Sequence, residues 1–95
     1  MPSYELVFIF NPDVQEDEFP RILGKVNDFI AKLGGTVTET NQWGKRKLAY
    51  PIKKKTEGNY VLERVQIKPT ALKELDANLK LSEDVLRYLF IREKS

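Results

Sequence analysis

The chain has 95 residues, of which 41% are hydrophobic and 32% charged, and its formal net charge is +2. This composition indicates one folded domain over residues 1–95, and no apolar run approaches the ~20 residues that a membrane-spanning helix needs. Cysteine and histidine are absent, which excludes disulfides and thiolate chemistry and removes the commonest metal ligand. We therefore expect a protein that is not an enzyme, binds no metal, needs no cofactor and takes no small-molecule substrate. The N-terminus shows no secretory pattern, so we also expect a cytoplasmic location.

The first third of the chain predicts a strand followed by a helix. Residues 4–10 are rich in aromatic and branched side chains and are apolar on both parities from Leu6 onward, as in a strand with both faces covered. Apolar residues then recur at three- and four-residue spacing, which predicts a helix over residues 16–33 that ends at Gly34-Gly35. Residues 16–18 are acidic and would lie in the first turn of that helix, where they interact favourably with its dipole.

The rest of the chain predicts a long strand, a returning strand, a second helix and a last strand, over residues 36–52, 60–67, 69–80 and 85–91. Pro51 lacks an amide donor, so the long strand is expected at a sheet edge. A turn is expected at residues 56–59, between the two strands of a hairpin. This order predicts an α+β, ferredoxin-like split βαβ fold (βαββαβ), with a four-stranded antiparallel sheet and two helices on one face.

Two helices on one face would leave the other face of the sheet without cover. The apolar residues that fall on the uncovered parity are Val7, Ile9, Tyr60, Leu62, Leu89 and Ile91. A patch of this kind is typical of a partner-binding site, although long side chains such as Arg64, Arg87 and Arg92 could shield part of it. Val7 and Ile9 stand where an RNA-recognition motif would carry a stacking aromatic residue, so a protein partner fits this face better than splayed-out bases do.

A basic stretch begins after Trp43. No acidic residue interrupts it, so its cations must face solvent or an anionic partner, and they are Lys45, Arg46, Lys47, Lys53, Lys54 and Lys55. Six cations so close together could contact several phosphates of an RNA, with binding that weakens steeply as salt is raised. The other interpretation is a solvated face that keeps an edge strand from pairing with other chains.

The segment Trp43-Gly44-Lys45-Arg46-Lys47-Leu48-Ala49-Tyr50-Pro51-Ile52 resembles the bacterial small-subunit ribosomal protein S6 family. The resemblance extends to the first strand, which begins Tyr4-Glu5 and ends in Asn11-Pro12, and to Tyr60-Val61-Leu62 after the turn. It implies a ferredoxin-like protein of the ribosome that is not an enzyme, forms a heterodimer with ribosomal protein S18 and binds with it to the central domain of 16S ribosomal RNA. Within the motif we interpret Arg46 as a polar contact and Leu48, Tyr50 and Ile52 as core or strand packing.

Our hypothesis is therefore a structural protein of the small ribosomal subunit that supports subunit assembly and translation. It would dock on its partner by the apolar sheet face and on ribosomal RNA phosphates by the basic residues. The alternative from another class is a ferredoxin-like regulatory module that self-associates through its open face and binds no RNA. Only the first predicts salt-sensitive RNA binding.

Overall fold

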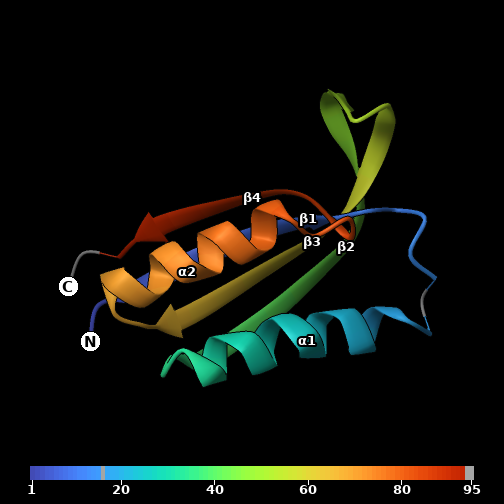
Figure 1. Cartoon of the computed structure of the whole chain (residues 1–95). Helices are drawn as coiled ribbons and strands as arrows, with labels where there is room; N and C mark the ends of the chain where they lie inside the picture. Colours follow the sequence, from blue (N-terminus) through green and yellow to red (C-terminus); the bar gives the residue numbers. More distant parts are fainter. Residues whose placement is uncertain (16, 94–95) are drawn as a thin grey trace.

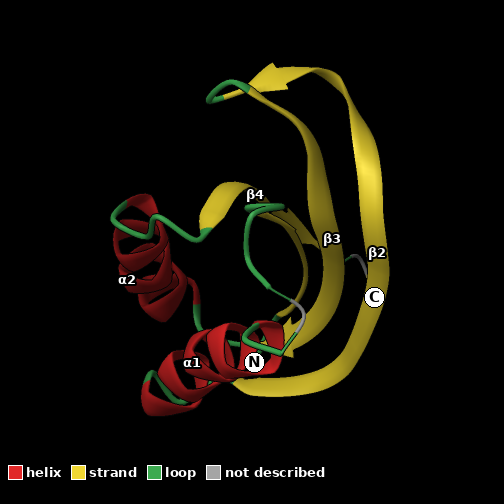
Figure 2. Cartoon of the chain, turned by 90° about the vertical axis from the view of Figure 1, so that its right-hand side faces the viewer, coloured by secondary structure: helices red, strands yellow, loops and turns green. Residues whose placement is uncertain are grey.

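The computed structural model describes residues 1–15 and 17–93. Its elements in chain order are β1 (Ser3–Phe10), α1 (Phe19–Lys32), β2 (Thr36–Ile52), β3 (Lys55–Gln66), α2 (Pro69–Lys80) and β4 (Val85–Arg92). The strands form one antiparallel sheet in the order β2-β3-β1-β4, and both helices lie on the same side of it (Figures 1 and 2). This confirms the predicted ferredoxin-like arrangement, including the edge position of β2.

The core lies between the sheet and the two helices. On β1 the even-numbered residues Tyr4, Leu6, Phe8 and Phe10 are at most 6% exposed. Because side chains alternate along a strand, their odd-numbered neighbours point to the opposite face. Buried residues of β3 and of both helices complete this core, among them Val61, Val65, Ile22, Ile30, Leu75 and Leu79. No helix in the described ranges 1–15 and 17–93 has the length and apolar character to cross a membrane.

Helix α1 begins later than its apolar periodicity predicts. Phe19 is its first residue and Pro20 lies in the first turn, where its missing amide leaves no hydrogen bond unmade. A helix that began at residue 16 would need the amide of Pro20 as a donor, so the predicted start is wrong. Glu18 is the N-cap, so Asp17 and Glu18 lie just before the first turn and not in it, which corrects their expected position. Residue 16 itself lies outside the described part. At the other end Gly34 adopts the expected left-handed conformation, with φ of 82°.

The hairpin between β2 and β3 turns at a different place from the predicted one. Lys53 and Lys54 form the turn, both with positive φ (49° and 68°), whereas residues 56–59 belong to β3. Positive φ at two successive residues is the geometry of a tight two-residue hairpin turn that matches strand twist. Gly58 does not turn the chain but allows close contact, because a Cβ atom there would lie 2.3 Å from Ile9 Cγ2.

Residues 45–58 extend beyond the end of β1, whose last pairing with β3 is Phe10 with Asn59. We call this two-stranded extension the arm. It rises out of the sheet next to the beginning of β4 (Figure 1), and it carries all six cations of the basic stretch.

Candidate interaction surfaces

All six residues predicted to bind a partner lie on the sheet face that the helices leave uncovered. The pairing brings Val7 between Leu62 and Leu89, and sets Ile9 opposite Tyr60. Leu89 and Ile91 are 56% and 43% exposed, Val7, Tyr60 and Leu62 are half-buried, and Ile9 is 9% exposed. The sequence parity therefore placed the residues correctly, and we call them, with Trp43, the open face.

Trp43 joins the open face because of an irregularity in β2. The pairing of β2 with β3 shifts between Gln42 and Gly44, and Gly44 has a positive φ of 81°. The indole of Trp43 stacks on Tyr60, with ring centroids 6.3 Å apart and an interplanar angle of 12°, yet remains 48% exposed. The alternation in the sequence did not place Trp43 among the partner-binding residues. A tryptophan beside a glycine in a strand was the available signal.

Charged side chains lie at both ends of the open face. At one end Arg64 approaches three carboxylates, with N···O distances of 3.8 Å to Glu5, 3.4 Å to Glu39 and 4.0 Å to Glu93. At the other end the Arg87 guanidinium lies 5.4 Å from the centre of the Tyr50 ring and donates a hydrogen bond to its hydroxyl. The face therefore has an apolar centre and polar ends, the usual anatomy of a protein interface.

The contact between Tyr50 and Arg87 also shows how the arm is placed. Tyr50 belongs to β2 and Arg87 to β4, at opposite edges of the sheet, so the arm crosses toward β4. Ile9 owes its burial partly to Gly58 of the arm, which lies against it. Leu48 and Ile52 are half-buried and Tyr50 is 55% exposed. None of these three residues belongs to the buried core, so of the two interpretations of the motif, core or strand packing, the core one is wrong.

The six cations do not form one surface. Arg46 alternates with Lys45 and Lys47 along β2, so it points to the other side of the arm, and its Nε donates to the Trp43 carbonyl oxygen at 3.2 Å. Lys53 and Lys54 stand in the turn and are exposed. Lys55 forms an ion pair with Asp13, the only such pair that any of the six makes within the described residues. Four lysines are thus exposed and unpaired there: Lys45, Lys47, Lys53 and Lys54.

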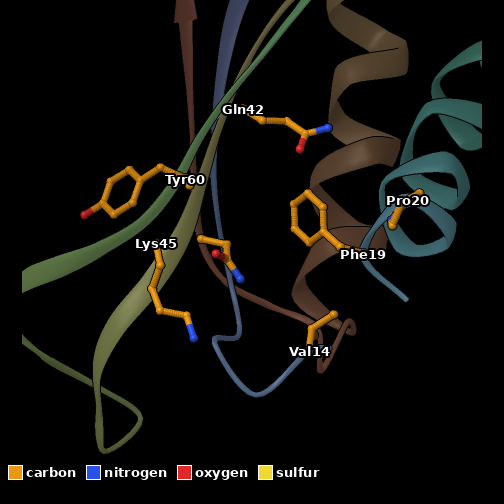
Figure 3. A pocket seen from close by; sticks show the side chains of 8 residues that line it. Val14, Phe19, Pro20, Gln42, Lys45 and Tyr60 are labelled. Carbon is orange, nitrogen blue, oxygen red and sulfur yellow. The ribbon is translucent and has the colours of Figure 1, made fainter. Parts of the chain in front are cut away.

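A cleft of about 310 Å³ separates the base of the arm from the beginning of α1. Its apolar side consists of Val14, Phe19 and Pro20, and Gln42 and Lys45 lie across from them (Figure 3). The sequence did not reveal this cleft, because its two sides come from segments that only the fold brings together.

Carboxylates are the remaining candidates for chemistry in the described residues. No group of three acidic residues there is placed to hold a metal ion. Glu63 is fully buried on the helix side of the sheet, where Thr40 Oγ1 donates to its Oε2 at 3.0 Å. Burial raises the pKa of Glu63, against the opposing effect of the neighbouring Thr40 hydroxyl and Asn27 amide. Neither the hydroxyl nor the amide titrates near neutral pH, so neither can exchange a charge with Glu63 there.

Comparison with known proteins gives one family. A family model described as ribosomal protein S6 matches residues 3–92. The small ribosomal subunit protein bS6 of Caldanaerobacter subterraneus is 42% identical over 92 residues, covering 97% of each chain. The protein of the same name from Fusobacterium nucleatum is 40% identical over 93 residues, covering 98% of this chain and 99% of its own.

Two solved structures are also similar. The crystal structure of 30S ribosomal protein S6 from Thermotoga maritima superposes with a TM-score of 0.91 at 29% identity, covering 97% of this chain and 87% of that one. The C-terminal domain of the MgtC protein from Mycobacterium tuberculosis superposes with a TM-score of 0.64 at 13% identity, covering 98% and 88%. The second likeness shows the fold alone.

Proposed function

Because the chain belongs to the ribosomal protein S6 family of the small ribosomal subunit, we propose that it binds the central domain of 16S ribosomal RNA as a heterodimer with ribosomal protein S18 and so supports subunit assembly. Membership of the family agrees with two expectations from the sequence, a protein that is not an enzyme and a cytoplasmic location on the ribosome.

The observation that carries this proposal is the open face. Trp43, Leu89 and Ile91 are 48%, 56% and 43% exposed on one sheet face, while the helices occupy the other. A contiguous apolar surface with polar ends is typical of a protein-binding site. We assign this face to S18, because burying it against a partner removes the exposed apolar side chains from water.

The arm supplies the RNA contacts in this proposal. Lys45, Lys47, Lys53 and Lys54 are exposed, and no carboxylate of the described residues pairs with them. Lysines placed in this way contact phosphates, which position a protein on RNA without reading its sequence. Arg46, which lies on the Trp43 side of the arm, and Lys55, which is held by Asp13, contribute less. Specificity then comes from the shape of the RNA and from the partner held beside it.

The test is binding to a central-domain fragment of 16S ribosomal RNA, with and without S18, at two salt concentrations. The informative variant is Lys45→Gln with Lys47→Gln. Its matched control is Lys25→Gln with Lys73→Gln, which removes the same charge from exposed positions on the two helices. We expect tight binding only with S18, a reduction of about tenfold in affinity for the arm variant, and a shallower salt dependence because fewer counterions are released.

Two outcomes would count against the proposal. If both double variants lower the affinity equally, the arm has no special role and only the overall charge matters. If the protein ignores the RNA with and without S18 and associates with itself, the regulatory alternative becomes the better explanation of the open face.

A further inference from the structure

The cleft between the arm and α1 has no role in the proposed function. Its volume of about 310 Å³ is at the lower end of the ~300–1,000 Å³ that ligand pockets occupy. It lies on the other side of β2 and β3 from the open face. Tyr60 borders the cleft, yet its ring points away from Phe19 (Figure 3). On the open face this ring stacks on Trp43. A ligand in the cleft would not compete with a partner on the open face.

One side of the cleft presents a fixed aromatic ring. Phe19 is the first residue of α1 and is only half-buried. Its ring packs edge-on against Phe10, with centroids 5.2 Å apart and an interplanar angle of 82°. Phe10 is fully buried in the core, so this contact holds the Phe19 ring in one orientation at the border of the cleft. A flat ligand can stack on such a ring at little cost in side-chain entropy.

The opposite side offers hydrogen-bonding groups and one positive charge. Gln42 and Asn59 each carry an amide that can both donate and accept, and in the described part of the chain neither side chain has a hydrogen-bond partner. The Lys45 side chain points into the same space (Figure 3), and no described carboxylate pairs with it. None of the described residues that line the cleft is acidic.

We infer that this cleft binds one unpaired base of the ribosomal RNA, stacked on Phe19, with its edge hydrogen-bonded by Gln42 and Asn59 and a neighbouring phosphate held by Lys45. This inference rests on the proposed function. Aromatic stacking, amide contacts to a base edge and an adjacent cation are the combination by which proteins recognise single-stranded RNA. Lys47 lies on the same side of the arm as Lys45, which continues the positive charge along the path of the RNA backbone. The cleft would thus add base recognition to the phosphate contacts of the arm.

The test uses the heterodimer with S18 and the central-domain RNA fragment. Gln42→Glu places a negative charge in the cleft at an exposed position, and Asn78→Asp places the same charge on an exposed position of α2 as the matched control. Phe19→Leu removes the aromatic ring but keeps an apolar side chain, and its thermal unfolding shows whether its fold is intact. Affinity is measured together with chemical probing of the Watson–Crick edges of unpaired bases.

We expect the heterodimer to protect one unpaired base from the probing reagent. Gln42→Glu and Phe19→Leu should each weaken binding about tenfold relative to Asn78→Asp, the loss typical of one base stack, and should expose that same base again. Equal affinity and equal protection in Gln42→Glu and Asn78→Asp would overturn the inference and leave the proposed function intact. Weaker binding of S18, with no change at any base, would overturn it as well. Absence of all RNA binding by the unsubstituted heterodimer would instead remove the proposed function itself.

Discussion

Glu63 is fully buried, which is unusual for a carboxylate. Thr40 satisfies one of its oxygens, while Glu63 Oε1 and Asn27 Oδ1 are both buried without a partner in the described residues. Burial raises the pKa of Glu63 above its ordinary value of 4.5. The folded state therefore holds this proton more tightly than the unfolded state. The stability that this contributes is fully present below pH 4.5 and is lost as the pH rises through the folded-state pKa.

We expect Glu63→Gln to be more stable than the unsubstituted protein at neutral pH, by about 1–3 kcal/mol, because a neutral amide avoids the cost of a buried charge. The amide can still accept from Thr40 and can donate to Asn27 Oδ1. Urea unfolding followed from mildly acidic to neutral pH checks this. The difference should shrink as the pH falls toward 4.5, and a difference that does not depend on pH would contradict the assignment.

Gly58 lies so close to Ile9 that a methyl group in place of its hydrogen atom would not fit. A Cβ atom there would lie 2.3 Å from Ile9 Cγ2, so Gly58→Ala should lower the free energy of unfolding by about 1–3 kcal/mol through overpacking. Gly24→Ala is the matched control, because nothing lies within 4 Å of a Cβ atom there and the position is inside α1. That control should raise stability by about 0.5–1 kcal/mol. Thermal unfolding of both variants measures the contrast, and equal effects would refute the close contact.

At the scale of elements, the turn of the arm combines backbone strain with charge. Lys53 and Lys54 both adopt positive φ, a conformation that costs residues other than glycine about 1–2 kcal/mol each. Asn-Gly is the sequence best suited to this turn. Since exposed cations serve the proposed RNA contacts, the unfavourable backbone is the kind of compromise that a functional segment makes.

Lys53→Asn with Lys54→Gly should therefore raise the free energy of unfolding by about 1 kcal/mol, which urea unfolding measures as a higher midpoint. The same variant should weaken RNA binding. Lys53→Gln with Lys54→Gln separates the two effects. It removes the same charges without relieving the backbone, so it should weaken RNA binding with no gain in stability. An Asn-Gly variant that is more stable yet binds RNA as before would show that these lysines do not contact the RNA.

At the scale of the whole molecule, substituting exposed leucines on different surfaces should have different effects on partner binding. Leu89 lies on the open face and is 56% exposed, whereas Leu81 follows α2 and is 86% exposed. We expect Leu89→Lys to abolish the heterodimer with S18, and with it tight RNA binding, because a lysine at the centre of an apolar interface would lose its hydration. Leu81→Lys adds the same charge and should leave both intact. Calorimetric titration with S18 makes the comparison, and loss of binding in both variants or in neither would reject the open face as the interface.

The sequence alone determined the order of elements, the edge position of β2 and the separation of the apolar strand residues into two faces. These features depend on periodicity, and the alternation along a strand is a local property of the backbone. The motif around Tyr50, which indicates the family, is likewise a property of the sequence and does not depend on how the arm packs.

Only the tertiary structure decided the rest. The hairpin turns at Lys53 and Lys54, although the Gly-containing segment 56–59 gave a stronger local signal. The contact between Tyr50 and Arg87 and the cleft beside Phe19 depend on how the arm leaves the sheet. Both features join residues that are far apart in the chain. Strand twist and packing bring these residues together, and local sequence patterns do not encode either.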